Sequence, residues 1–286
     1  MTSNKPNKGL LRWATFLAAA MLFGPGIGYV AARITPVPGG VDGTALLSAQ
    51  PLMGVLTMVM CIGAAGTIGA IASRFVSIGQ GLTCMGVALA WACFQTGHLP
   101  GLARAIDPAS LSTKLAIEGA VLGLLVLAAA AVLLRHGWPD EKLTVKSFFS
   151  GQALAGALVT TAAGLCTAWL IAQDDKPGQT LAASVAAGAV GAAIARTVVH
   201  AAPRASTLLA IPLGAIACPL IGFAMTKGNL ETAILGGTVS PLARIMPIDW
   251  CAGMLIGLPF GLSWAGSMIE KAQEKPAAAR SASVRA

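Results

Sequence analysis

Long apolar stretches alternate with short polar segments along the whole chain, and this pattern predicts the class of the protein. A helix needs about 20 largely apolar residues to cross a bilayer. Eight stretches come close to that length, at residues 13–32, 52–72, 76–94, 115–134, 153–172, 180–199, 208–225 and 248–268. The pattern therefore predicts an all-α, polytopic integral membrane bundle of about eight transmembrane helices.

The polar segments between these stretches predict the organisation of the chain. We expect a cytoplasmic N-terminal tail, a first four-helix half, a cytoplasmic connector, a second four-helix half and a disordered cytoplasmic tail. Their ranges are 1–12, 13–134, 135–148, 149–269 and 270–286. Composition agrees with a membrane protein, because 56% of the residues are apolar and only 10% are charged. Soluble domains carry about 25% charged residues.

The basic residues indicate the orientation of the bundle. With eight spans and a cytoplasmic N-terminus, 13 of the 19 Lys and Arg fall on the cytoplasmic side. This bias follows the positive-inside rule and predicts that both termini of this cell-membrane protein are cytoplasmic. The net charge of +8 then reflects topology, and we expect contact with the lipid bilayer but not with nucleic acid. The six Trp lie near span ends, as in interfacial aromatic belts.

The two halves share a short sequence pattern. Gly66, Gly69 and Arg74 in the second span match Gly188, Gly191 and Arg196 in the sixth at a constant offset. A parallel 4+4 internal repeat would explain the match. Chance would explain it too, because Gly, Ala and Leu are common throughout the chain.

Two acidic residues, Glu118 and Asp249, lie inside apolar stretches. An ionised carboxylate in hydrocarbon is costly, so such residues commonly face a bundle interior and mark ion or substrate pathways. The pair would bind a cation or take up a proton, with Arg104 and Arg244 neutralising them on the outer side. The structural alternative is that Asp249, two residues after Pro247, lies in the first helical turn, where the helix dipole stabilises an acid.

Three residues, Gly24, Pro25 and Gly26, interrupt the first apolar stretch. Gly and Pro weaken helices, and broken spans often line binding sites in transporters. We therefore regard these residues as candidates for lining a ligand path. The alternative is a kink, or a close crossing of two helix backbones.

A second glycine pattern indicates helix packing. Gly253, Gly257 and Gly261 recur every four residues and form one smooth face of the eighth span. Such faces allow close approach of a neighbouring helix, either within the chain or in a partner membrane protein, which could be a second copy.

Enzyme and cofactor motifs are not found in the sequence. It contains no HExxH, GxSxG, phosphate-binding loop or dinucleotide fingerprint. The six Cys form no CxxC pair, so we expect no metal site and no cofactor. The chain is therefore more consistent with a non-enzyme, although loop residues such as His98, Asp107 and the two arginines would form an outer active site if they converged.

Two functional hypotheses follow. The first, which we take as the leading one, is a small-solute or ion transporter, coupled to protons or cations through Glu118 and Asp249. The second is a non-transporting membrane scaffold or assembly subunit whose small-residue faces pack against partner helices. The scarcity of polar residues within the spans favours the second hypothesis, while the two acids favour the first. The half-apolar segment Lys227–Met246 is expected to lie on the outer surface or to form a re-entrant hairpin.

Overall fold

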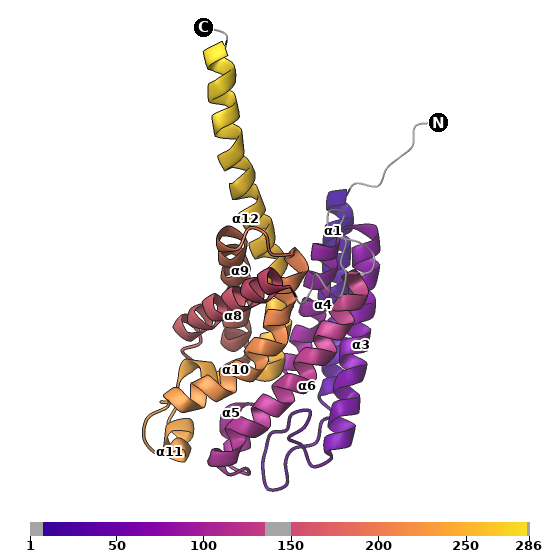
Figure 1. Ribbon diagram of the computed structural model, residues 1–286. Helices are drawn as coiled ribbons and strands as arrows, with labels where there is room; N and C mark the ends of the chain where they lie inside the picture. Colours follow the sequence, from indigo (N-terminus) through magenta and orange to yellow (C-terminus); the bar gives the residue numbers. More distant parts are fainter. Residues whose placement is uncertain (1–7, 135–149, 285–286) are drawn as a thin grey trace, which may run out of the picture.

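Apolar helices run between two faces of the molecule in the computed structural model, which describes residues 8–134 and 150–284, with side chains for 9–134 and 150–269 (Figure 1). Within these residues, seven helices are long and apolar enough to cross a membrane, and Ile78–Cys93 is a shorter apolar helix of 16 residues. The predicted all-helical membrane bundle of about eight helices is therefore confirmed. The whole predicted connector 135–148, and residues 1–7 of the N-terminal tail, lie outside the described residues.

The eight spans are built from the following elements. They are α1 (Lys8–Leu17), η1 (Ala18–Phe23) and α2 (Gly24–Ala31) as the first span, then α3 (Pro51–Phe75), α4 (Ile78–Cys93), α6 (Pro108–Leu134), α8 (Gly151–Ile171), α9 (Pro177–Val198), η2 (Arg204–Leu209) with α10 (Ala210–Met225), and α12 (Pro247–Val284). Three short elements connect them: α5 (Leu99–Ala103), α11 (Leu230–Leu235) and η3 (Pro241–Arg244).

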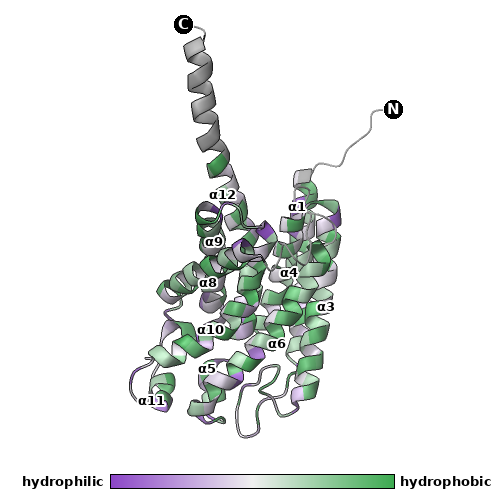
Figure 2. Cartoon of the chain, viewed as in Figure 1, coloured by the Kyte–Doolittle hydropathy of each residue, from purple (hydrophilic) through white to green (hydrophobic). Residues whose placement is uncertain are grey.

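The two ends of the bundle differ in structure. The end where α1 begins and α12 runs out is here named the terminal face, and the opposite end, with α5 and α11, is named the cap face (Figure 1). Apolar residues dominate the helices between the two faces (Figure 2). The segment Lys227–Met246 lies at the cap face, since α11 contacts α5 there.

The last helix does not end where its apolar stretch ends. α12 continues to Val284, although residues 270–286 were expected to be disordered, so that expectation is wrong for the described part of the tail. The segment is rich in Lys, Glu, Gln and Ala, which favour helix. It also extends a helix that already exists, and extension avoids the cost of nucleation.

Proline and small polar residues set where the helices begin. α3, α6, α9 and α12 each start with a proline, which lacks the N–H that would be unsatisfied at that position. Asp107 caps α6, with the Ala109 N–H donating to its carboxylate at 3.3 Å. Ser77 caps α4 by accepting the N–H of Gln80. These local signals explain why the predicted span boundaries lie close to the observed ones.

At the centre of the bundle, helices of one half pack against helices of the other. α4 packs against α12 and α6 packs against α10, so the third helix of each half contacts the fourth helix of the other. On the outside, the first-half helix α3 packs mainly on α4, whereas the second-half helix α9 packs mainly on α12 and α8. The large shared core of buried side chains runs through all of these contacts.

A second, smaller apolar core closes the cap face. It joins α5, α11 and the ends of α6 and α10 with the loop before α3, and its members include Leu47, Leu102, Leu115, Phe223 and Ile234. Because these side chains are buried, the cap-face loops form a packed layer over the helices. Its loop before α3 also reaches Glu118 of α6.

For Trp250, the prediction of an interfacial position is wrong. It lies near a span end, but its side chain is completely buried, so it does not belong to an interfacial aromatic belt. Its indole N–H donates to the Ala210 carbonyl at 3.1 Å. The ring occupies the space left by Gly214, where a β-carbon would be 2.1 Å from the indole.

Candidate functional site

Glu118 is held by a turn from the cap-face loop. Its side chain is buried, and one carboxylate oxygen accepts the Thr44 hydroxyl at 2.5 Å and the Leu46 N–H at 3.0 Å. The N–H groups of Ala45 and Leu47 also lie within hydrogen-bonding reach. Successive N–H groups that converge on one carboxylate form an anion-binding nest. Glu118 therefore fixes the loop to α6.

The turn that holds Glu118 is seated on the first turn of α3. Residue 54 of α3 is a glycine, and a β-carbon there would be 2.2 Å from the carbonyl oxygen of Ala45. A second backbone bond, from the Thr44 N–H to the Leu47 carbonyl at 2.7 Å, closes the turn. The loop backbone can approach Glu118 only because Gly54 leaves this space.

Asp249 is held mainly by side chains. It is buried in the first turn of α12 and accepts the Thr180 hydroxyl at 2.6 Å. The thiol of Cys93, at the end of α4, and the N–H of Met246 lie near its carboxylate, although the thiol itself donates to the Leu89 carbonyl at 3.6 Å. The contact with Met246, which precedes Pro247, is that of an acid reaching back to cap its own helix. Asp249 thus joins α12 to α9 and α4, and it is buried rather than exposed at the surface.

The two acid sites have a common layout. In each half, the acid of the fourth span accepts a hydroxyl from a threonine that lies before or within the first turn of the second span: Thr44 for Glu118 and Thr180 for Asp249. Cys251 lies within electrostatic reach of both carboxylates. Each acid therefore takes its hydroxyl donor from its own half, and Asp249 also lies near the Cys93 thiol of the first half.

Glycines bring the central helices into close contact beside these acids. A β-carbon at Gly119 would lie 2.2 Å from the Ala215 carbonyl oxygen, and one at Gly123 would lie 2.5 Å from Pro212. On the other side, Gly86 of α4 would meet the Ala252 carbonyl oxygen at 2.8 Å. The helices that carry or flank Glu118 and Asp249 therefore cross at backbone distance.

The two arginines that were expected to neutralise the acids lie elsewhere. Arg244 donates to the carbonyl oxygen of Gln173, to that of Gly237 at 2.7 Å and to that of Val239 at 3.1 Å. Arg104 has an exposed side chain. Neither forms an ion pair with Glu118 or Asp249. Arg244 instead ties the loop before α12 to the connection between α8 and α9.

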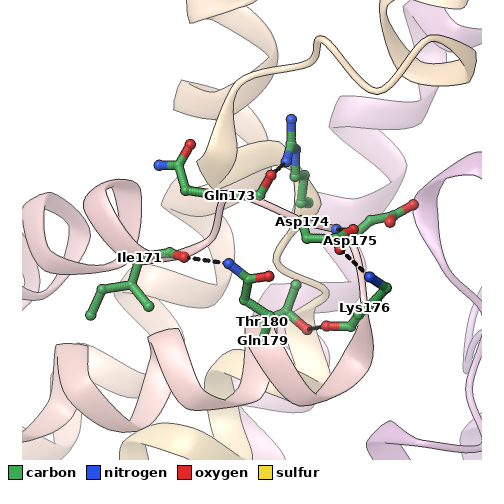
Figure 3. Close-up of polar contacts among 8 residues, drawn as sticks. Ile171, Gln173, Asp174, Asp175, Lys176, Gln179 and Thr180 are labelled. Atoms are coloured by element: carbon green, nitrogen blue, oxygen red, sulfur yellow. Dashed lines mark hydrogen bonds and ion pairs between the residues drawn. The ribbon is translucent and has the colours of Figure 1, made fainter.

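The connection between α8 and α9 is shown in Figure 3 as far as Thr180, whose hydroxyl donates to Asp249. Gln179 donates to the Ile171 carbonyl at 2.9 Å, and Lys176 pairs with Asp174 at 2.7 Å. Hydrogen bonding to Lys176, with a smaller contribution from Asp175, lowers the pKa of Asp174 to about 2. Thr180 follows within one turn, so this exposed ion pair borders the residue that binds Asp249.

The first span is not broken at Gly24–Pro25–Gly26, and that expectation is wrong. The helix is continuous from Gly9 to Ala31, with the π-helical turn η1 immediately before Gly24. Because Pro25 has no N–H, one carbonyl in the preceding turn has no α-helical donor, and a π turn accommodates this missing bond without breaking the helix. A β-carbon at Gly24 would lie 2.1 Å from the Trp91 ring, whereas Gly26 has open space around it. Gly24 therefore permits a close helix contact.

The glycine face of the eighth span lies against α9. A β-carbon at Gly253 would be 2.3 Å from Ser184, one at Gly257 would be 2.0 Å from the Val185 carbonyl oxygen, and one at Gly261 would be 2.0 Å from that of Ala189. This face is therefore already occupied within the chain.

The hollows lined by described residues include three that lie away from the two acids. A very small one lies beside Arg196 at the terminal face. An apolar groove of about 560 Å³ lies between α8 and α10, and a more polar cavity of about 510 Å³ lies between α2 and α3. Neither Glu118 nor Asp249 lines any of the three.

Sequence reasoning did not find the residues that bind the two acids. Thr44, Thr180 and Cys93 carry no motif, and the hydrogen-bonded threonines are 74 and 69 residues away from their acids. The available signal was weak: a buried carboxylate requires donors, and a threonine precedes or opens the second span of each half.

Comparisons with known proteins found no matching family model, no matching curated protein and no matching solved structure. The arrangement of the chain's own residues therefore carries the functional argument.

Proposed function

We propose that this chain is a non-transporting membrane scaffold or assembly subunit that holds a transmembrane helix of a partner protein in its α8–α10 groove. The groove carries the proposal. It is lined by apolar residues that include Leu165, Cys166, Trp169, Ile221 and Met225. Trp169 is 42% exposed and Met225 is 50% exposed. A helix packed there would bury both residues.

The hydrogen bonds of the two buried acids support the same proposal. Glu118 and Asp249 already accept hydrogen bonds from Thr44, Leu46 and Thr180. A substrate or ion would have to displace these bonds, and each bond to a charged group contributes about 1.5–3 kcal/mol. Carboxylates bound in this way tie loops and helices together, which is the property of a rigid scaffold.

Cys166 offers a direct test, because it is the exposed cysteine of the six and lines the groove. We would attach a benzophenone maleimide to Cys166 in native membranes and irradiate. The matched control is Leu124→Cys in a Cys166→Ser background, since Leu124 is 58% exposed on α6. The expected result is one discrete cross-linked membrane protein from Cys166 and none from residue 124. Equal or absent cross-linking at the two positions would contradict the scaffold.

A small-solute or ion transporter, coupled to protons or cations, is the second candidate. It is favoured by the grouping of Asp249, Thr180 and Cys93, which joins an acid, a hydroxyl and a thiol from both halves in the interior. On this proposal Glu118 and Asp249 would exchange protons or cations. Purified protein in liposomes that enclose a pH-sensitive dye should then conduct protons, and Glu118→Gln or Asp249→Asn should abolish the flux while the protein remains folded.

The orientation is part of the same proposal. With eight spans and a cytoplasmic N-terminus, 13 of the 19 basic residues would fall on the cytoplasmic side, and both termini would lie in the cytoplasm of a cell-membrane protein. A fluorescent-protein fusion at the C-terminus should be bright, and an alkaline phosphatase fusion there should be inactive. The opposite pattern would invert the orientation without affecting the choice between scaffold and transporter.

A further inference from the structure

The cavity between α2 and α3 differs from the other hollows in its chemistry. It has a volume of about 510 Å³ and is lined by Tyr29, Arg33, Gln50, Met53 and Met60, among others. Arg33 is the only charged residue in the lining. The cavity therefore presents one cation beside apolar side chains.

The polar and apolar parts of this cavity are separated along the membrane normal. Arg33 and Thr35 follow the end of α2, and Gln50 precedes the start of α3, so these polar residues lie nearest the cap face. Met60 lies nine residues into α3, which places it about 14 Å further along the helix. A molecule that fills the cavity would meet a polar end at the membrane surface and an apolar end inside.

Arg33 is positioned but not neutralised by its neighbours. One guanidinium nitrogen donates to the Tyr29 hydroxyl at 2.5 Å, and the guanidinium carbon lies 4.9 Å from the centre of the Tyr29 ring. Arg33 forms no ion pair with an acid of the described residues. A guanidinium has five N–H donors in a planar fork that matches a phosphate group. Most of these donors remain available.

The exposure of the lining indicates where a ligand would come from. Tyr29 is 66% exposed, Met53 55% and Met60 66%, and all three belong to membrane-spanning helices. The cavity therefore opens toward lipid as well as toward the membrane surface. From this geometry we infer that the cavity binds an anionic phospholipid, with the phosphate on Arg33 and an acyl chain along Met53 and Met60.

The test measures binding of spin-labelled phosphatidylglycerol to the purified full chain in phosphatidylcholine nanodiscs. Wild type should bind it in preference to spin-labelled phosphatidylcholine. Arg33→Gln should weaken binding about tenfold, because a charge-assisted hydrogen bond is lost. Thr57→Trp should also weaken it by filling the cavity, which Thr57 lines. Lys114→Gln is the matched control, since it removes an exposed cation from the first part of α6.

Separate outcomes would overturn the inference. Equal affinity of wild type and Arg33→Gln for phosphatidylglycerol would show that Arg33 does not bind the phosphate. Loss of binding in Lys114→Gln as large as in Arg33→Gln would indicate general charge attraction. Competition by soluble glycerol phosphate as strong as that by the lipid would show that the site binds a free anion. Arg33 is exposed, so its substitution is expected to leave the fold intact.

Discussion

The second spans of the two halves carry the same glycine spacing but pack differently. In α3, a β-carbon at Gly66 would lie 3.6 Å from Ala129 of α6, an ordinary contact. In α9, the matching Gly188 would place a β-carbon 3.0 Å from the backbone of Leu258 of α12. The first glycine of the pattern therefore makes a loose contact in the first half and a tight one in the second. The second glycines are tight in both halves, since a β-carbon at Gly69 would lie 2.9 Å from the Gly81 carbonyl oxygen and one at Gly191 would lie 2.4 Å from that of Thr160.

The fourth spans explain this difference. The glycines of α12 face its own half, against α9, whereas Gly119 and Gly123 of α6 face α10 of the other half. A glycine stripe permits close approach, but the complementary surface decides which helix approaches. The comparison teaches that the partner of a small-residue motif depends on both surfaces.

A large residue at the tight contact between α9 and α12 should have the largest effect on stability. Gly257→Leu would drive a side chain into the Val185 carbonyl oxygen and should destabilise the protein by about 3 kcal/mol or more. Thermal unfolding and size-exclusion chromatography in detergent would measure the loss. Gly266→Leu on the same helix is the control, because a β-carbon there meets nothing within 4 Å. Gly66→Leu should cost far less, and equal losses at residues 66 and 257 would refute the difference between the halves.

Removing the Glu118 carboxylate should have the next largest effect. Glu118→Ala leaves the Thr44 hydroxyl and the Leu46 N–H without their acceptor, at a cost of about 3 kcal/mol. Glu118→Gln keeps one acceptor oxygen and should cost less. Hydrogen exchange of residues 44–48 would report the release of the turn. Unchanged exchange in Glu118→Ala would show that the turn is held by its own packing.

The two threonines should differ in importance. Thr180→Val removes the hydroxyl donor to Asp249 and should cost about 2 kcal/mol. Thr44→Val should cost about 1 kcal/mol, because Glu118 retains donors from the loop backbone. Because valine keeps the shape of threonine, the loss of stability in each variant reports the lost hydrogen bond. Thermal unfolding of the two variants would compare these losses. A larger loss in Thr44→Val would reverse our account of the two sites.

The smallest effect is expected at the exposed pair between α8 and α9. Lys176→Met should raise the pKa of Asp174 from about 2 toward its ordinary value of 3.8. Because the folded pKa is the lower one, the pair contributes at pH above 3.8 and its contribution disappears as the pH falls toward 2. Carbon NMR of the Asp174 carboxyl would measure the shift. Lys227→Met is the control. It removes another loop cation of the cap face and should leave the titration of Asp174 unchanged.

Much of the fold could be predicted because its signals are local. About 20 consecutive apolar residues identify a spanning helix wherever it occurs, and prolines such as Pro108 and Pro247 mark helix starts. The stripe of Gly253, Gly257 and Gly261 is equally local. Such features depend on neighbours in the chain, so the sequence was enough to predict a bundle of about eight membrane helices and most of the places where they begin. The fourth apolar stretch predicts a span that begins at residue 115, whereas α6 begins at Pro108.

The partners of the buried groups were decided only by the tertiary structure. Glu118 and Thr44 are 74 residues apart, and nothing in either segment specifies the other. Trp250 is buried because Gly214 of another helix leaves room for its ring. Arg244 binds the carbonyl oxygen of Gln173 in a distant loop, and that of Gly237 in its own loop, rather than the nearby acid. Contacts of this kind depend on how helices cross and loops fold back, which periodicity along the chain does not encode.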